Sequence, residues 1–259
     1  MRWFIDISYR GEPYHGWQVQ PGVVTVQSTL EDALSTVMRQ PVAVTGAGRT
    51  DAGVNARRMI AHIDLPDGYR PDNSFMRSLN SLCGRDIAIN SILPVRADAH
   101  ARFDAVERTY RYFVHTEKNP FLGKLSWQGP TELDFDAMNL AALELLGQKD
   151  FTSFSKLHTD VKTNICDLRA AQWHHLEGER WFFEITADRF LRNMVRAVVG
   201  TLVDVGRHKL TANDLVDILQ AKDRCAAGTS MPAEPLFLWE VKYPDNIFLE
   251  DTYLYDSED

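Results

Sequence analysis

The sequence predicts an α+β fold made of two similar halves, each with a mostly antiparallel sheet. Segments in which apolar residues recur at every second position, typical of strands, are mixed along the chain with segments in which apolar residues recur at helical spacing. The connections are short and show no regular strand, helix, strand repeat, which argues against a parallel-sheet fold. The order of elements also begins again after residue 104. We therefore predict halves at 1–104 and 105–244, followed by an acidic tail at 245–259.

The first half is expected to open with a strand, a loop and a helix. Apolar side chains alternate with others over 3–9, which is the period of a half-buried strand. Thr25 is a suitable N-cap for a helix over 26–38, where apolar residues recur at helical spacing before Pro41. The other elements of this half are a short strand at 42–45, a strand at 59–65, a helix at 75–82 and a strand at 86–95.

The second half is expected to follow a similar order. Residues 106–115 alternate as a strand, and Asp134 is placed to cap a helix that stops near Gly147. The elements that follow are strands near 163–174 and 180–187, helices near 190–205 and 212–221, and a last strand at 236–243.

Composition and cysteine usage exclude several classes of protein. The chain has 259 residues, of which 44% are hydrophobic, so it can bury a core without disulfides or a structural metal. Cys83, Cys166 and Cys225 form no metal-ligand or disulfide pattern, which favours a reducing, cytoplasmic location. No apolar run approaches the roughly 20 residues that span a bilayer, and the first residues do not resemble a signal peptide. We therefore expect no metal and no membrane partner.

The charge is unevenly distributed along the chain. There are 28 Lys and Arg against 36 Asp and Glu, a net charge of −8. Six of the acids lie in residues 245–259, which contain no Lys or Arg, so the rest of the chain is close to neutral. The apolar residues that could anchor this tail are Ile247, Phe248, Leu249, Tyr253 and Leu254. Local basic patches, and with them a nucleic-acid partner, are compatible with the composition.

A glycine-rich loop at 46–54 is the most unusual segment. It reads Gly-Ala-Gly-Arg-Thr-Asp-Ala-Gly-Val, so that three glycines surround Arg49 and Asp51. Glycine permits sharp turns and a close approach to a ligand, and a nearby arginine keeps an aspartate ionised. Such a carboxylate suits a nucleophile or an electrostatic stabiliser. The loop lacks the ending of a phosphate-binding P-loop, and the alternative interpretation is a turn with a local salt bridge.

A second segment combines arginine with tyrosine on a strand. Within 106–115, Arg108, Tyr110 and Tyr112 share one face, and Arg111 lies on the other. A face of arginine and tyrosine suits stacking on bases and contact with phosphate. The alternative is an ordinary half-buried strand, because such strands commonly carry tyrosine.

A third segment, 188–196, leads into a helix. If the helix includes Arg189, then Arg189, Arg192 and Arg196 lie on one face and form a basic stripe. A solvated helix face is the alternative. Arg196 nevertheless stands in an otherwise apolar run, where a charge without an acidic partner would be costly.

Taken in order, these segments resemble the bacterial tRNA pseudouridine synthase A family. The resemblance extends over about residues 3–244, and its Gly-Arg-Thr-Asp-Ala-Gly block is highly specific. The other matching segments are 14–18, 101–103, 108–112, 150–154 and 190–196.

The resemblance implies isomerisation of uridine to pseudouridine at positions 38, 39 and 40 of the tRNA anticodon stem-loop, without cofactor or metal. Asp51 matches the family's catalytic aspartate, which attacks either the uracil ring or the ribose. Tyr110 matches the tyrosine that stacks on the flipped base and helps remove its C5 proton. Arg196 matches the arginine that pairs with the aspartate, and so opposes the rise in pKa that burial would cause.

The resemblance also implies two halves around a central basic cleft, a homodimer, and tRNA as the partner. Extruding a uridine costs a few kcal/mol, which stacking on Tyr110 offsets, and holding the arm requires phosphate contacts. The side chains expected to bind the substrate are Arg49, Thr50, Arg57, Arg58, Arg108, Arg111, Arg192, Phe154 and Gln18.

The sequence departs from the family pattern at three places. Asn55 stands where the family usually has His, Arg10 replaces an Asp, and Glu234-Pro235 replaces His-Gly. Asn55 still offers a hydrogen bond, whereas Pro235 removes a backbone donor. None of the three changes the catalytic trio.

Two alternatives belong to other functional classes. A non-catalytic RNA-binding protein would not need a carboxylate facing RNA phosphate, so Asp51, Tyr110 and Arg196 together argue against it. A glycoside hydrolase would need a second carboxylate beside Asp51, and the sequence offers no convincing partner.

Overall fold

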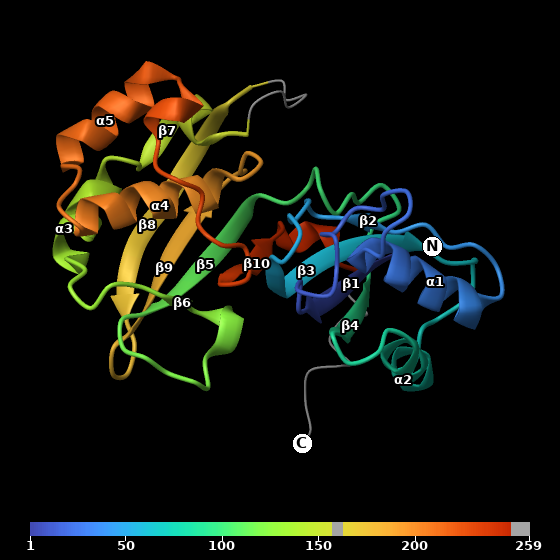
Figure 1. The fold of residues 1–259 in the computed structure, drawn as a ribbon. Helices are drawn as coiled ribbons and strands as arrows, with labels where there is room; N and C mark the ends of the chain where they lie inside the picture. Colours follow the sequence, from blue (N-terminus) through green and yellow to red (C-terminus); the bar gives the residue numbers. More distant parts are fainter. Residues whose placement is uncertain (157–162, 250–259) are drawn as a thin grey trace. The chain divides into compact units, whose positions relative to one another are not determined.

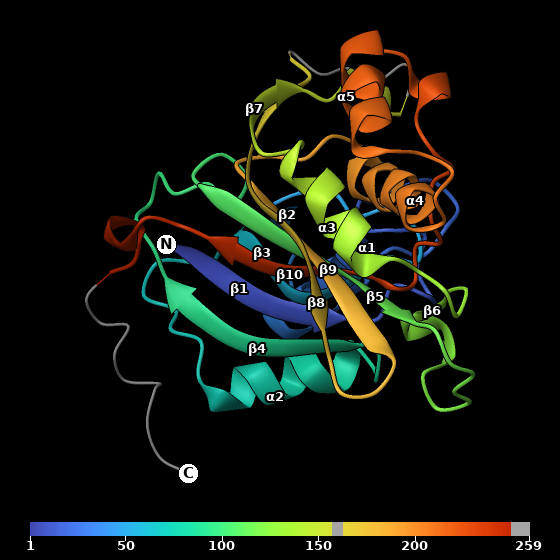
Figure 2. The same ribbon diagram turned by 90° about the vertical axis from the view of Figure 1, so that its left-hand side faces the viewer.

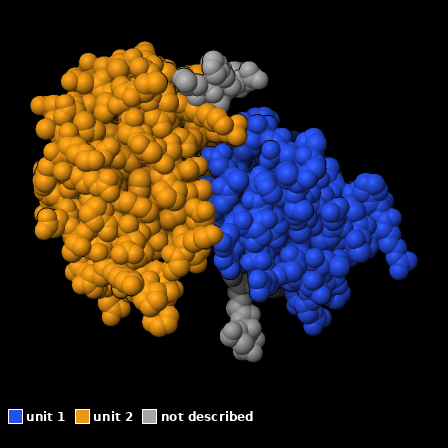
Figure 3. Space-filling view, in the orientation of Figure 1, with its two compact units in different colours: residues 1–106, 238–259 blue, residues 107–237 orange. Residues whose placement is uncertain are grey.

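The computed structural model describes residues 1–156 and 163–249. The chain forms two compact units: unit 1 is Met1–Val106 with Leu238–Asp259, and unit 2 is Glu107–Phe237 (Figure 3). The first boundary lies two residues beyond the predicted one at 104. The last strand, β10 (Leu236–Lys242), differs from the prediction, because most of it belongs to unit 1, where it neighbours β3 (Asn55–Asp64).

Unit 1 contains a sheet with the strand order β4-β1-β3-β10 (Figure 1). Antiparallel pairing joins β1 (Arg2–Tyr9) to β3 on one side and to β4 (Ile87–Pro94) on the other, and the two-residue β2 (Thr45–Gly46) also pairs with β3. Trp3, Ile5, Ile7 and Tyr9 of β1 are buried, as the period of two predicts, and Phe4 on the opposite face is buried as well.

Two helices, α1 (Val26–Met38) and α2 (Asn73–Leu82), complete unit 1, and they contact each other. The start of α1 confirms the predicted cap: the Thr25 hydroxyl accepts from the Ser28 backbone N, and the Ser28 hydroxyl accepts from the Thr25 N, both at 3.1 Å. The next two backbone N–H groups donate outside the helix, Val26 to the Gly16 carbonyl and Gln27 to the Trp17 carbonyl. The first turn of α1 is therefore fixed to the segment that precedes it.

The sheet of unit 2 has the order β5-β9-β8-β7, all antiparallel. Its strands are β5 (Glu107–His115), β7 (Gly147–Asp150), β8 (Ile165–His175) and β9 (Arg180–Ala187), and β6 (Trp127–Gln128) pairs parallel with β5. The sequence prediction missed β6 and β7, because segments of two and four residues, the longer one largely polar, carry no period that could reveal them.

The helices α3 (Phe135–Leu143), α4 (Met194–Gly206) and α5 (Ala212–Ala221) complete unit 2 (Figure 2). Asp134 caps α3 as predicted, since its Oδ1 accepts from the Ala137 N at 2.8 Å. Contacts of α3 with α4, α5 and β8 place it at the centre of the helical layer. Within the described residues, no helix has the length and apolar character needed to cross a membrane.

The start of α4 corrects one prediction. Asn193 adopts a left-handed conformation (φ 65°), so the helix begins at Met194 and not near residue 190. Asparagine tolerates this conformation better than most residues, but a residue in it cannot lie inside a right-handed helix. Arg189 and Arg192 therefore lie outside α4, and the predicted basic stripe with Arg196 does not form.

The described start of the C-terminal segment is anchored to unit 1. Ile247 is buried and its carbonyl accepts from the Arg96 N at 3.0 Å, while the Phe248 ring lies 6.2 Å from that of Phe4. The Leu249 N donates to the Pro94 carbonyl. Ile247 and Phe248 therefore anchor the start of the tail as expected, whereas the Leu249 side chain is exposed. Tyr253 and Leu254, the other two residues expected to anchor it, lie outside the described residues.

Candidate active site

Asp51 lies in the loop between β2 and β3 of unit 1. The loop turns at Gly53 (φ 81°), and the Val54 N donates to the Asp51 carbonyl at 3.1 Å. The Asp51 side chain is half-buried and that of Arg49 is exposed. The glycine-rich sequence thus forms a hydrogen-bonded turn that leaves both charged side chains within reach of solvent.

Thr50, directly before Asp51, is held from two directions. Its hydroxyl is hydrogen-bonded to that of Tyr9 at 2.7 Å, and its carbonyl accepts from the Trp17 N at 3.1 Å. Gly16 (φ 86°) passes so close that a Cβ there would lie 2.7 Å from the Thr50 carbonyl oxygen, so a side chain does not fit. Gly16 and Trp17, in the first matching segment, therefore support the aspartate loop by close packing and by a backbone hydrogen bond.

Asn55 follows the loop and has an internal role. It is 1% exposed, and its Oδ1 accepts from the Gly11 N at 2.9 Å. Gly11 is packed tightly, because a Cβ there would lie 2.1 Å from the Val54 carbonyl oxygen. The neighbouring departure, Arg10, forms an exposed ion pair with Glu12 at 2.7 Å. Both departures from the family pattern thus have partners within unit 1.

Arg57 and Arg58 are both exposed although they are consecutive residues of a strand. The register of β1 against β3 shifts between Ile7 and Tyr9, so that both arginines face the single residue Ser8. This β-bulge places two neighbouring cations in contact with solvent, which regular alternation would not allow.

Each of these arginines has a partner. The Arg57 guanidinium lies 4.5 Å from the centre of the Trp239 ring, and Arg58 approaches Asp6 at 2.7 Å and Glu240 at 3.9 Å. They line an open hollow of about 480 Å³ on unit 1. A phosphate bound there would therefore compete with two carboxylates for Arg58.

Tyr110 lies on β5 of unit 2. Its ring meets that of Phe190 edge to face, with centroids 5.0 Å apart. Tyr112 is fully buried, whereas the Arg111 Nε is 2.7 Å from Glu184 Oε2 on the neighbouring strand. Arg111 and Tyr110 are adjacent in a regular ladder, so their side chains point to opposite faces of the sheet.

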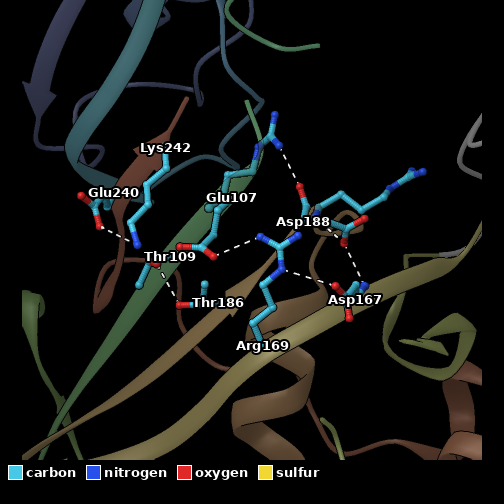
Figure 4. A network of polar contacts seen from close by, with 10 residues as sticks. Glu107, Thr109, Asp167, Arg169, Thr186, Asp188, Glu240 and Lys242 are labelled. Carbon is cyan, nitrogen blue, oxygen red and sulfur yellow. Dashed lines mark hydrogen bonds and ion pairs between the residues drawn. The ribbon is translucent and has the colours of Figure 1, made fainter. Parts of the chain in front are cut away.

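Arg108 fixes the turn before α4. Its Nη1 donates to the Asp188 carbonyl at 2.8 Å, and the Asp188 carboxylate accepts from the Asp167 N at 2.8 Å (Figure 4). Arg169 extends this network, since it contacts Asp167 at 3.3 Å and Glu107 at 3.1 Å. The arginine expected to bind substrate is therefore also a structural support of unit 2.

Arg196 lies in the first turn of α4 and is half-buried. Its Nε donates to the Met231 carbonyl at 2.5 Å, and the Met231 N donates to the Arg196 carbonyl at 3.1 Å. Burial raises the pKa of the Tyr112 hydroxyl, and the positive charge of Arg196 opposes that rise. Arg192 precedes the helix and is exposed.

Two of the three cysteines, Cys83 and Cys166, are buried. Burial raises the pKa of Cys83 to about 11 and that of Cys166 to about 12, so both thiols stay protonated at neutral pH. Across residues 1–156 and 163–249, no group of three or more His, Cys, Asp or Glu side chains is arranged to hold a metal ion.

Known proteins match this chain along nearly its whole length. A family model described as tRNA pseudouridine synthase matches residues 141–244. The tRNA pseudouridine synthase A of Parabacteroides distasonis is 53% identical over 247 residues, which cover 95% of this chain and 98% of that protein. The corresponding protein of Porphyromonas gingivalis is 53% identical over 250 residues (96% and 99%), and that of Bacillus subtilis 38% identical over 247 residues (94% and 99%).

The chain belongs to the tRNA pseudouridine synthase A family.

For this family member, the expected site residues divide between the units. Unit 1 carries Asp51 and its neighbours, and unit 2 carries Tyr110 and Arg196. Two residues expected to bind substrate differ sharply in accessibility: Phe154 is 0% exposed and packs near Phe151, whereas Gln18 is exposed.

Tyr9 and Trp239 contact residues of the expected site in this family member, although nothing in the sequence marks them. Tyr9 looked like an ordinary residue of an alternating strand, and Trp239 like a residue of the last strand. Their contacts, with Thr50 and Arg57, join residues far apart in sequence. Pattern analysis of one sequence contains no signal for such pairs.

Proposed function

We propose that this protein isomerises uridine to pseudouridine at positions 38, 39 and 40 of the tRNA anticodon stem-loop, with Asp51 as the nucleophile. The observation that carries the proposal is the support of the Asp51 loop. Two hydrogen bonds hold the backbone on either side of Asp51: the Trp17 N donates to the Thr50 carbonyl, and the Val54 N donates to the Asp51 carbonyl. The Asp51 side chain itself is half-buried. A rigid backbone that presents an accessible carboxylate is what a nucleophile requires.

In the proposed reaction, the target uridine leaves the helical stack and lies against the Tyr110 ring. The Asp51 carboxylate attacks the uracil ring or the ribose, and the N1–C1′ bond breaks. The freed uracil turns, and its C5 bonds to C1′. C5 then loses its proton, in which Tyr110 assists, N1 gains one, and the carboxylate is released.

Arg196 is assigned as the cationic partner of Asp51 in this reaction. Its Nε donates to the Met231 carbonyl, which holds the guanidinium at the first turn of α4, and an arginine beside a carboxylate favours the ionised form of that carboxylate. Substrate and product have the same composition and oxidation state, so the reaction as proposed needs no cofactor or metal.

Arginines in both units are assigned to the RNA backbone: Arg49, Arg57, Arg58, Arg108, Arg111 and Arg192. Arg49 lies within the aspartate loop and Arg192 precedes α4, and both side chains are exposed. Arg58 and Arg111 are paired with carboxylates in the free protein, so phosphate binding there involves an exchange of partners. Gln18 is exposed and completes the assigned substrate-binding set. Phe154 is fully buried and Thr50 is 7% exposed, so these two residues of the expected set are assigned to support the site and not to contact RNA.

The protein is further proposed to act as a homodimer in the cytoplasm. The resemblance to its family supports the dimer, and the free thiols of Cys83, Cys166 and Cys225 suit a reducing compartment. Sedimentation equilibrium of the purified chain tests the dimer: a mass of one chain at micromolar concentration would contradict it.

The function is tested by tritium release from C5-labelled uridine in unmodified tRNA. We expect release with the wild type, mapping to the anticodon arm, because exchange of N1 for C5 expels the C5 hydrogen. Asp51→Ala should abolish release and leave the affinity for tRNA within about twofold, since one small carboxylate contributes little to phosphate binding. A filter-binding titration measures that affinity.

Two results would contradict the proposal. Substantial release by Asp51→Ala would exclude the aspartate as the nucleophile. Tight tRNA binding without any release by the wild type would instead favour an RNA-binding protein that is not an enzyme. Asp67→Ala, which removes an exposed carboxylate of the same unit, is the matched control and should retain wild-type release.

A further inference from the structure

We propose that Tyr9 is a positioning residue for Asp51, acting through Thr50. This inference rests on the proposed role of Asp51 as the nucleophile. Tyr9 ends β1, 41 residues before Thr50 in the sequence, and neither composition nor motif spacing connects the two residues.

The contact itself is short and shielded from water. The two hydroxyl groups lie 2.7 Å apart, and Tyr9 and Thr50 are only 5% and 7% exposed. Breaking such a bond leaves a buried hydroxyl without this partner, which is unfavourable because water cannot readily replace it. The side chain of Thr50 is therefore confined to the rotamer that meets Tyr9.

The Tyr9 ring cannot easily move away from this position. It follows the register shift between β1 and β3, and the Trp17 ring lies 6.1 Å from it. Trp17 is fixed in turn, because a Cβ on Gly46 would lie 2.5 Å from the Trp17 ring. Tyr9 therefore gives Thr50 a fixed point of attachment within the core of unit 1.

Thr50 transmits this constraint to Asp51. The Trp17 N holds the Thr50 carbonyl, which belongs to the peptide group that joins Thr50 to Asp51. Tyr9 holds the side chain on the other side of the same residue. With both bonds present, neither rotation of the Thr50 side chain nor tilting of the peptide can displace Asp51, and catalytic groups must be held within about 0.5 Å.

Because Tyr9 is buried, it does not contact RNA, and its effect should appear in the chemical step. We expect Tyr9→Phe, which removes only the hydroxyl, to lower kcat at least tenfold while KM and the dissociation constant for tRNA change less than about twofold. Single-turnover tritium release and filter binding measure the two quantities separately.

The matched control is Tyr14→Phe, which removes the hydroxyl of another buried tyrosine nearby. Tyr14 is 9% exposed, and its hydroxyl makes no bond to Thr50 in the described structure. This variant should keep the wild-type kcat. Thr50→Ser retains a hydroxyl and should preserve most of kcat, whereas Thr50→Val should match Tyr9→Phe.

The double variant Tyr9→Phe with Thr50→Val distinguishes positioning from general destabilisation. If the two residues act through one bond, the double variant should be no slower than the slower single variant. Equal kcat for Tyr9→Phe and wild type, or independent multiplicative losses in the double variant, would overturn the inference. Absence of release by the wild type would instead refute the proposed function.

Discussion

Burial determines how individual side chains of this protein respond to pH, and His62 is the clearest case. Burial lowers its pKa to about 4, and the charges of Arg2 and His100 act in the same direction, whereas Asp64 opposes them. The neutral ring has a use, because His62 Nδ1 accepts from the Ala101 N at 3.1 Å. Protonation of that nitrogen would remove the acceptor that holds the backbone of Ala101 in place, at the start of the segment 101–103.

His62 predicts a loss of stability in mild acid. In the unfolded chain a histidine takes up its proton near pH 6.5, but in the folded protein His62 does so only near pH 4. The unfolded state therefore binds more protons between these values, and the free energy of unfolding should fall by about 2 kcal/mol as the pH drops from 6.5 to 4. Urea unfolding at several pH values measures this.

A substitution isolates the histidine from the many other groups that titrate in this range. His62→Gln keeps a hydrogen-bond acceptor but has no titratable ring. The decrease in the free energy of unfolding between pH 6.5 and 4 should therefore be smaller by about 2 kcal/mol in this variant. His175→Gln, which replaces an exposed histidine, should leave the fall unchanged. An unaltered pH profile for His62→Gln would show that the ring does not govern the acid response.

The residues of the site differ in how far a sequence can reveal them. Asp51 and Arg49 could be selected as candidates because glycines and charges in one short loop form a local signal. The expected division of Tyr110 and Arg111 between two faces also followed from strand alternation. Tyr9 could not be found, because its bond to Thr50 depends on which strands pair and where the register shifts.

At the scale of elements, the short segment before α1 serves two structures at once. The carbonyls of Gly16 and Trp17 accept from the first turn of α1, and the Trp17 N donates to Thr50 in the aspartate loop. The start of α1 and the support of the loop that carries Asp51 thus share a dipeptide. Damage at the helix start should therefore reach the loop.

The capping box of α1 tests this connection. Thr25→Ala removes the hydroxyl that accepts from the Ser28 N, and we expect it to lower the free energy of unfolding by about 1 kcal/mol. Chemical denaturation measures the change. Thr25→Ser keeps the cap and should retain most of the stability, so equal losses in both variants would point to lost packing of the methyl group rather than to the cap.

Helix starts also show why some element boundaries could be predicted and others not. Thr25 and Asp134 are residues that cap helices by their own chemistry, and both caps were predicted correctly. Asn193 sits inside a run whose apolar spacing continues the helical period backwards to Leu191. Its left-handed conformation, together with its side-chain bond to the Ser230 hydroxyl at 2.6 Å, depends on tertiary structure.

At the scale of the whole molecule, unit 1 is built from two stretches of chain that flank all of unit 2. The sequence prediction divided the chain at residue 104 and assigned the last strand to the second half, whereas the structure divides it after Val106 and places the chain from Leu238 onward in unit 1. The last strand was assigned to a half from its position in the sequence alone, because the pairing of strands this far apart leaves no pattern in the residues of either strand. In the structure β10 neighbours β3, and Ile247 is buried beside it in unit 1.

Removal of the C-terminal end should therefore damage unit 1, although most of that unit comes from the N-terminal part of the chain. A chain ending at Phe237 loses most of β10 and the Ile247 anchor, so β3 becomes an incompletely paired edge strand and the protein should aggregate or unfold at a lower temperature. A chain ending at Leu249 keeps every described contact of unit 1 and should remain folded. Thermal melting and light scattering distinguish them; a stable monomer ending at Phe237 would contradict this assignment.

The split of unit 1 has a consequence for biosynthesis. Translation at about 5 to 20 residues per second delivers Glu107–Phe237 in roughly 7 to 26 s, during which the nascent chain already carries Asp51 but lacks the strand that completes the sheet of unit 1. A ribosome that stalls within this stretch would release a product with an open edge, suited to capture by chaperones or proteases. The arrival of the last strand thus couples completion of the polypeptide to completion of its first unit.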